Sequence, residues 1–225
     1  MTFSIVARCA ASGQFGVAVT SSSPAVAARC AFVRAGAGAV ASQNVTDPRL
    51  GPSALDAMAS GQAAQAAVEK VITDAGNAGW RQLLAVDADG GTAIFSGTRA
   101  LGINAESRAQ DAASAGNLLA NPEVPSAVLA GFAAASGQLG DRLMAALFAG
   151  LDAGGEAGPL HSAGMLIAGD QSWPLVDLRC DWTEECPIRA LEAAWQVYRP
   201  QIDDYVTRAL DPGASPSYGV AGDDR

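Results

Sequence analysis

Positive charge is scarce in this chain of 225 residues, and lysine is almost missing. Lysine and arginine total 14 against 23 aspartate and glutamate residues, which gives a net charge of -9, and Lys70 is the single lysine. Binding to nucleic acid needs clustered cations that neutralise phosphates. The arginines here are scattered along the sequence, so we expect no nucleic-acid partner.

Residue types that bind metals are also rare. His161 is the one histidine, and the cysteines at 9, 30, 180 and 186 show no Cys-x-x-Cys spacing. Structural zinc sites use four Cys or His ligands at short spacings. We therefore expect no metal and no other cofactor, and we take the cysteines as reduced and structural.

Long apolar runs are missing as well. No segment approaches the roughly 18 to 20 apolar residues that span a bilayer, and the N-terminus lacks the basic head of a signal peptide. We expect no membrane partner and a cytoplasmic location.

What the sequence does contain is a large apolar fraction, because 49% of its residues are hydrophobic and only 16% are charged. This composition is typical of a globular chain, and its length suits one domain. We predict a single domain over residues 1–210. Residues 211–225 are rich in Pro, Gly and Asp and are expected to form a surface tail or an arm onto a neighbouring subunit. We also expect a homo-oligomer, because the apolar fraction is high and this tail could pack on a partner subunit.

The hydrophobic periodicity predicts strands mixed with helices. Short apolar runs between turn-forming residues predict strands, at residues 2–8, 15–20, 38–43, 81–86, 92–96, 112–119, 162–168 and 175–181. Ala-rich or amphipathic segments predict helices, at residues 52–60, 62–75, 124–135, 138–153 and from 187 to about 210 with a bend at Pro200. Hairpin-length links between strands indicate an α+β fold with mainly antiparallel sheets.

The first two predicted strands form a hairpin on which the functional hypothesis depends. The second strand ends in three consecutive serines, and antiparallel pairing places them at the same end of the hairpin as Thr2. If Met1 is removed, Thr2 carries both a hydroxyl and a free α-amine. Such an amine has a pKa of roughly 7.7 to 8.0 and can act as the base that activates the hydroxyl.

Segments along nearly the whole chain resemble a known family. The resemblance lies in residues 2–8, 16–26, 34–40, 43–51, 116–119 and 176–179. They resemble the domain of unknown function 1028 family, which is grouped with the N-terminal nucleophile (Ntn) hydrolases. The resemblance implies a four-layer αββα sandwich and an N-terminal Thr nucleophile.

The resemblance also suggests groups that assist Thr2. Proteasome-like members of the superfamily have an acidic residue where Ser22 falls and a lysine near the position of Arg34. Ser22 could orient the amine by hydrogen bonding, or it could belong to an ordinary loop. Arg34 could supply a positive field but, being always protonated, could not accept a proton. Its simpler alternative is an ion pair with a surface carboxylate.

Further polar residues could line the site. Gln43 ends the third predicted strand, Asn44 follows it, and Asn117 interrupts an apolar strand. All three are candidates for stabilising an oxyanion. Their alternative is ordinary hydrogen bonding at a turn or a strand end. Asp177 could orient Thr2 or the substrate, or it could simply pair with Arg179, which lies on the same strand face.

The remaining candidates are substrate-binding residues. Ser21 and Ser23 flank the end of the second strand, close to the expected position of Thr2. Asp47 and Arg49 lie on the turn after the third strand. Arg49 could bind a substrate carboxylate through its planar guanidinium, or it could stabilise the turn by pairing with Asp47.

Three hypotheses of function remain open. The leading one is a hydrolase that cleaves an amide-like C–N bond of a small molecule through an acyl-enzyme on Thr2. A second is a ligand-binding or scaffold protein without turnover. A third is a hydrolase that uses Cys9, Cys30 or a serine together with His161, since a Ser-His-Asp or Cys-His triad would have to include the single histidine.

The leading hypothesis predicts the mass of the mature protein. We expect the intact mass to be lower than that of the full sequence by one methionine residue, because Thr2 needs a free amine. Retention of Met1 in catalytically active protein would contradict this mechanism, since the nitrogen of Thr2 would then be an amide.

Overall fold

The N-terminal hairpin lies at the centre of the larger of two antiparallel sheets. In the computed structural model, which describes residues 1–223, β1 (Thr2–Arg8) pairs with β2 (Phe15–Ser21), and Phe3 lies opposite Thr20. Nearly every residue of both strands is buried. The predicted hairpin, with Thr2 and the serines at one end, is therefore confirmed.

The larger sheet has six strands in the order β10-β9-β2-β1-β8-β7, all antiparallel neighbours. Its other strands are β7 (Ala105–Ala109), β8 (Ala112–Asn117), β9 (Ser162–Ala168) and β10 (Pro174–Cys180). The smaller sheet has four strands in the order β3-β4-β5-β6. They are β3 (Ala31–Arg34), β4 (Gly38–Asn44), β5 (Arg81–Asp87) and β6 (Thr92–Ser96).

Two of these strands, β3 and β7, were not predicted from the sequence. Both lie at a sheet edge and have only four and five residues. Such short strands give little periodic signal, and each is defined by pairing with a longer neighbour. A single helical turn, α1 (Ala27–Cys30), precedes β3.

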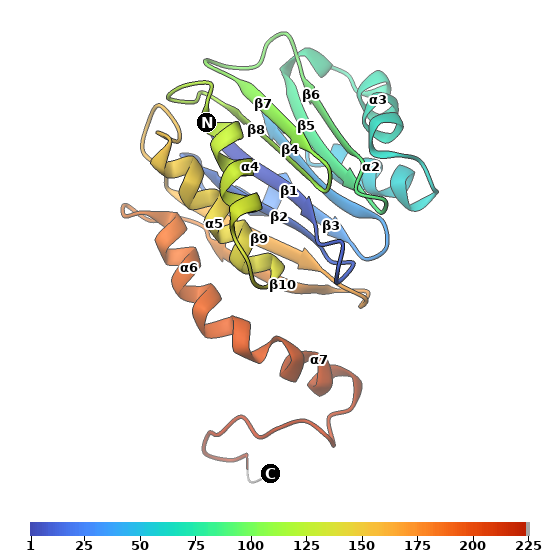
Figure 1. The fold of residues 1–225 in the computed structure, drawn as a ribbon, viewed down its shortest axis with the longest axis vertical. Coiled ribbons are helices and arrows are strands. Elements are labelled where there is room, and N and C mark those ends of the chain that lie inside the picture. Colours follow the sequence, from blue (N-terminus) through green and yellow to red (C-terminus); the bar gives the residue numbers. More distant parts are fainter. Residues whose placement is uncertain (224–225) are drawn as a thin grey trace.

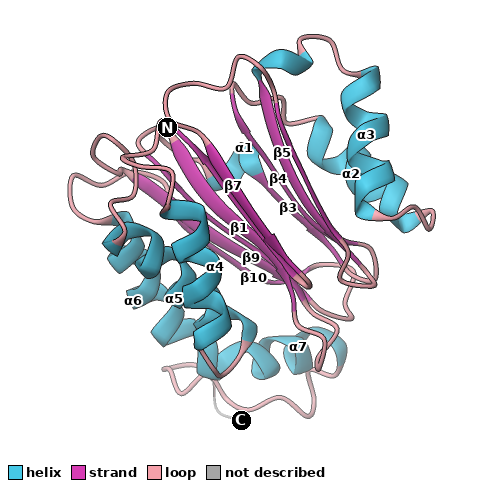
Figure 2. Ribbon diagram, turned by 45° about the horizontal axis from the view of Figure 1, so that its top comes forward, coloured by secondary structure: helices cyan, strands magenta, loops and turns pink. Residues whose placement is uncertain are grey.

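Helices cover the outer faces of the two sheets, which face each other (Figures 1 and 2). The smaller sheet is covered by α2 (Leu50–Ala59) and α3 (Ala64–Asp74). The larger sheet is covered by α4 (Val124–Ala134), α5 (Leu139–Asp152) and α6 (Pro187–Tyr198). The expected mixture of helices and antiparallel sheets is thus confirmed.

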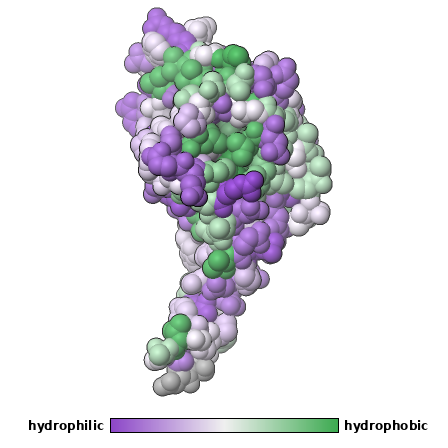
Figure 3. All heavy atoms as spheres, turned by 90° about the vertical axis from the view of Figure 1, so that its left-hand side faces the viewer, coloured by the Kyte–Doolittle hydropathy of each residue, from purple (hydrophilic) through white to green (hydrophobic). Residues whose placement is uncertain are grey.

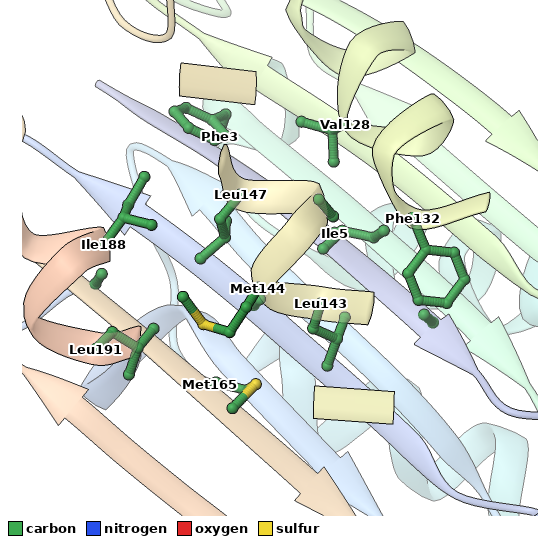
Figure 4. Close-up of a cluster of buried hydrophobic side chains, with 14 of the residues drawn as sticks. Phe3, Ile5, Val128, Phe132, Leu143, Met144, Leu147, Met165, Ile188 and Leu191 are labelled. Atoms are coloured by element: carbon green, nitrogen blue, oxygen red, sulfur yellow. The ribbon is translucent and has the colours of Figure 1, made fainter. Parts of the chain in front are cut away.

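Alternation along the strands divides the core into three parts. Phe3 and Ile5 pack against the helices that cover the larger sheet (Figure 4), whereas Val6 points to the other side and packs between the two sheets. The third cluster lies between the smaller sheet and its two helices. Most of the buried apolar residues between the sheets therefore come from alternate positions of β1, β2, β4, β5 and β8.

The C-terminal segment extends away from the body (Figures 1 and 3). Two short 3-10 helices lie at Ala78–Trp80 and Arg199–Gln201. The last helix, α7 (Ile202–Leu210), follows the second of them, and none of its residues is buried. Residues 211–223 contain no helix or strand, and 224–225 lie outside the described residues. Across residues 1–223, no helix combines the length and apolar character needed to cross a bilayer.

Close packing between α2 and β3 gives a test of the fold. A Cβ added at Gly51 would lie 2.1 Å from Cδ2 of Phe32. We expect Gly51→Ala to lower the free energy of unfolding by about 1–3 kcal/mol, because the ring or the helix must shift. Urea unfolding measures this change. Gly76→Ala is the matched control, since its added Cβ meets nothing within 4 Å. Equal losses in the two variants would contradict this packing.

Candidate functional site

The space between the two sheets is apolar at one end and polar at the other. Val6, Val17 and Leu84 belong to the apolar end. At the other end, the same strand faces present buried polar side chains, namely Thr2, Ser4, Ser21, Gln43, Gln82 and Asn117. The pairing of Thr2 with Asn117, and of Gln43 with Gln82, places them at this common end.

Four of these side chains form a hydrogen-bonded network that joins the sheets. Ser4 Oγ donates to Gln43 Oε1 over 2.7 Å, and Gln43 Nε2 donates to Gln82 Oε1 over 2.7 Å. Asn117 Nδ2 also donates to Gln82 Oε1, over 3.2 Å. Buried polar groups need such partners. The network therefore fixes the strand end on which Thr2 lies.

The hydroxyl of Thr2 begins a second group of contacts. Thr2 Oγ1 lies 3.3 Å from Ser21 Oγ, and both hydroxyls donate to the carbonyl oxygen of Met1. Ser21 Oγ lies 2.8 Å from Ser23 Oγ, which accepts a 2.6 Å hydrogen bond from Arg29 Nη2. The Met1 carbonyl thus joins the Thr2 and Ser21 hydroxyls, and Ser23 connects Ser21 with the guanidinium of Arg29.

A buried carboxylate, Glu156, lies at the same end of the molecule. The backbone N–H of Ser22 donates to Glu156 Oε2 over 3.2 Å, and Glu156 Oε1 is buried without a hydrogen-bond partner. Burial raises the pKa of Glu156 to about 7, while the positive amino terminus and the hydrogen bonds from Ser22 act in the opposite direction. The carboxyl group therefore lies within electrostatic reach of the chain's amine.

The structure brings together five of the eleven residues predicted to line the site. Thr2, Ser21, Ser23, Gln43 and Asn117 all lie at the polar end described above. Their convergence follows from the two-residue period of the strands and from the antiparallel pairing.

Two further predicted residues have local roles in this structure. Ser22 contributes its backbone N–H to Glu156. Asn44 has a positive φ of 71°, donates to the carbonyl of Trp80 over 2.6 Å and accepts from the N–H of Leu101 over 3.2 Å. Its side chain therefore joins the 3-10 helix before β5 to the loop after β6.

Arg34 is not brought to this site, which corrects the prediction. It pairs with Gly38 at the beginning of β4, whereas Gln43 lies near the end of that strand. Its guanidinium forms a 2.8 Å ion pair with Asp56 of α2. The β3–β4 hairpin was not predicted, and its reversal places Arg34 at the opposite end. The arginine connected to the hydroxyls is Arg29.

The other predicted charges are neutralised locally. Asp177 of β10 accepts two hydrogen bonds from Arg179, of 2.6 and 2.8 Å. Asp47 likewise accepts hydrogen bonds of 2.9 and 2.7 Å from Arg49, which hold the pKa of Asp47 at about 2. Each carboxylate is thus bound by its neighbouring arginine, and the structure gives neither pair a contact with the Thr2 hydroxyl.

The residues that sequence reasoning missed are Ser4, Gln82, Glu156 and Arg29. Glu156 lies in the Gly-rich segment 154–159, which was predicted only as a loop. Gln82 is a lone amide at the start of an apolar strand, and this was the one signal available for it. Arg29 becomes relevant only because α1 folds its side chain back onto Ser23.

Met1 covers Thr2 in this structure, and Thr2 is only 5% exposed. A Cβ added at Gly158 would lie 2.9 Å from Cε of Met1, so the Met1 side chain packs against that loop. A cavity of about 500 Å³ lies instead beside the β1–β2 turn and is lined by residues that include Cys9 and Trp195. Seven residues of β1 separate the two places by roughly 20 Å.

The His161 side chain is bound outside this polar network, although its backbone N–H donates to the carbonyl of Ser21 over 2.9 Å. The His161 ring stacks on Trp182, and Nδ1 lies 2.8 Å from the carbonyl oxygen of Thr183. Within residues 1–223, no group of three or more His, Cys, Asp or Glu side chains is placed to hold a metal ion.

Together these features define a mixed helix and sheet domain with a buried polar strand end at its N-terminus. Residues 2–191 match the model of a family of unknown function, DUF1028, and the chain belongs to this family. Protein SPO2555 from Silicibacter pomeroyi, whose crystal structure is described by the same family model, is 31% identical with a TM-score of 0.81. The alignment covers 87% of this chain and 88% of that one. No curated protein matches the sequence.

The network gives a test of how the site is supported. Gln82→Leu removes the acceptor shared by Gln43 and Asn117, and we expect the free energy of unfolding to fall by about 2–4 kcal/mol, since buried donors lose their partners. Chemical denaturation measures the loss. Gln65→Leu on the exposed face of α3 is the control, for which we expect a change within about 0.5 kcal/mol. A neutral Gln82→Leu would contradict the role assigned to the network.

Proposed function

We propose that this protein is an N-terminal nucleophile hydrolase that cleaves an amide-like C–N bond of a small molecule. Thr2 is the nucleophile once Met1 has been removed. The observation that supports this most is the pair of hydroxyls of Thr2 and Ser21, 3.3 Å apart at a buried strand end, both directed at the carbonyl of Met1.

The arrangement of layers supports the finer assignment of the fold. Helices α2 and α3, the smaller sheet, the larger sheet and helices α4 to α6 follow one another across the molecule (Figure 2). We propose that this is the four-layer αββα sandwich of the Ntn hydrolases. In that fold the nucleophile begins a central strand, as Thr2 begins β1.

The Met1 carbonyl indicates where a substrate carbonyl would bind. It belongs to an amide, and it accepts hydrogen bonds from the Thr2 and Ser21 hydroxyls. With Met1 removed, Ser21 Oγ is available to donate to the oxygen of a substrate amide. Such a donor stabilises the negative charge that develops on this oxygen in the transition state.

The chemistry then needs only groups of this chain and water. Thr2 Oγ1 attacks the substrate carbonyl carbon, and the α-amine takes the hydroxyl proton. The C–N bond breaks, the amine returns the proton to the leaving nitrogen, and an ester forms on Thr2. Water, deprotonated by the same amine, then attacks the ester and releases a carboxylic acid and free Thr2.

The second candidate is a ligand-binding or scaffold protein with the same fold. It is favoured by the cavity of about 500 Å³ that lies away from Thr2. The hydrolase that uses His161 has less support, because the ring is already engaged with Trp182 and Thr183.

We further propose that the protein is a cytoplasmic homo-oligomer. The support for assembly is the exposed apolar surface along the C-terminal segment. Exposed large apolar side chains of this segment are Val197, Tyr205, Leu210, Tyr218 and Val220.

Covalent trapping tests the proposed nucleophile. Incubation with p-nitrophenyl acetate, stopped with acid so that the acetyl group does not migrate to the adjacent α-amine, should place an acetyl ester on Thr2. Mass spectrometry of the pepsin-digested protein detects the ester, and hydroxylamine removes it. We expect Thr2→Ala to lower the rate of acylation at least about 1,000-fold, as for loss of other catalytic nucleophiles. Thr2→Ser should retain labelling, because it keeps both the hydroxyl and the amine.

His161→Ala is the matched control and should lose little labelling. A hydroxylamine-sensitive adduct that persists in Thr2→Ala would contradict the proposal. Loss of labelling in His161→Ala alone would favour the histidine-dependent alternative.

A further inference from the structure

Glu156 has no part in the chemistry proposed above, yet its environment is unusual. The side chain is 6% exposed, and only one of its two carboxyl oxygens has a hydrogen-bond partner. A buried carboxyl oxygen without a partner costs free energy, so natural proteins rarely retain one without a reason. The unpartnered oxygen, Oε1, is therefore free to accept a hydrogen bond from another donor.

The backbone around Glu156 is fixed at the strand end that carries Thr2. Leu119 and Glu156 form an isolated antiparallel bridge, flanked by hydrogen bonds of 3.0 Å from Ala157 N to Leu118 O and from Ala120 N to Gly155 O. These contacts begin directly after β8, whose last residue, Asn117, lies opposite Thr2. The carboxyl group is thus placed by main-chain pairing rather than by a free loop.

Met1 lies between this loop and the serine hydroxyls. Its side chain packs against Gly158, its carbonyl oxygen accepts from Ser21, and its amine acts on the ionisation of Glu156. Removal of Met1 would leave the nitrogen of Thr2 as the chain's amine, in the region bordered by Glu156 and Ser21.

We propose that Glu156 is the positioning residue for the α-amine of mature Thr2, with Oε1 accepting a hydrogen bond from that amine. This inference rests on the proposed function. The hydrogen bond fixes the amine nitrogen beside the Thr2 hydroxyl, where it can take the hydroxyl proton. The carboxyl group itself does not touch the reacting carbon.

The charge of Glu156 also sets the direction of the expected effect. A carboxylate beside an amine favours the protonated amine and raises its pKa. Other charged or titratable residues near this end are Arg29, which is hydrogen-bonded to Ser23, and Cys30, whose thiol has its pKa raised by burial. His161 is a third, since its backbone N–H donates to the carbonyl of Ser21. Replacing Glu156 by glutamine keeps its shape and removes the negative charge, so the apparent pKa of the amine should fall.

The experiment is pH-dependent acetylation of the N-terminal amine in the full-length protein. N-hydroxysuccinimidyl acetate modifies only the unprotonated amine, and mass spectrometry of the N-terminal peptide gives the midpoint pH of labelling. We expect the midpoint to fall by about one pH unit in Glu156→Gln. Glu156→Asp keeps the negative charge, so its midpoint should remain closer to that of the wild type. Glu106→Gln, on exposed β7, should not shift the midpoint.

The outcomes separate this inference from the proposed function. Equal midpoints in wild type and Glu156→Gln, with Thr2 still acetylated as an ester by p-nitrophenyl acetate, would overturn only the role of Glu156. Retention of Met1 in active protein would overturn both. If Glu156→Gln does not fold, Glu156→Asp is measured in its place. Because this variant keeps the negative charge, a midpoint more than about one unit below wild type would overturn the inference.

Discussion

The hydrogen-bonded network between the two sheets is the constraint on which the site depends. Burying Ser4, Gln43, Gln82 and Asn117 between sheets is favourable only if each finds a partner. Their mutual bonds satisfy this requirement and tie the beginning of β1 to the smaller sheet. The same interior that is held together by apolar packing at one end is therefore fixed by polar bonds at the end where Thr2 lies.

The groups around Thr2 differ in what they contribute. Ser21 and Ser23 provide hydroxyls in series, Arg29 provides a permanent positive charge, and Glu156 provides a buried carboxyl group with its pKa raised to about 7. In the proposed chemistry, the amine of Thr2 must be unprotonated to act as a base. We propose that Glu156 holds this amine in place, whereas Arg29 is bound to the Ser23 hydroxyl.

Several parts of this site could be predicted from the sequence, because they depend on residues that lie close together in the chain. The hairpin of β1 and β2 is short and continuous in sequence, so its register places Thr2 beside the serines. Asn117 was recognised as a polar residue in an apolar strand. Arg34 was misplaced because the β3 strand gave no periodic signal, and Glu156 was missed because a Gly-rich loop has no period from which to place a side chain.

The sequence by itself determined the composition of the core, most of the helices and strands, and the position of a hydroxyl at the start of a buried hairpin. Tertiary structure decided which distant residues meet that hydroxyl. Gln82, Arg29 and Glu156 come from separate elements, and only the stacking of the sheets and the bridge between Leu119 and Glu156 bring them near the N-terminus. Periodicity is a property of neighbouring residues, whereas contacts between elements depend on how those elements pack.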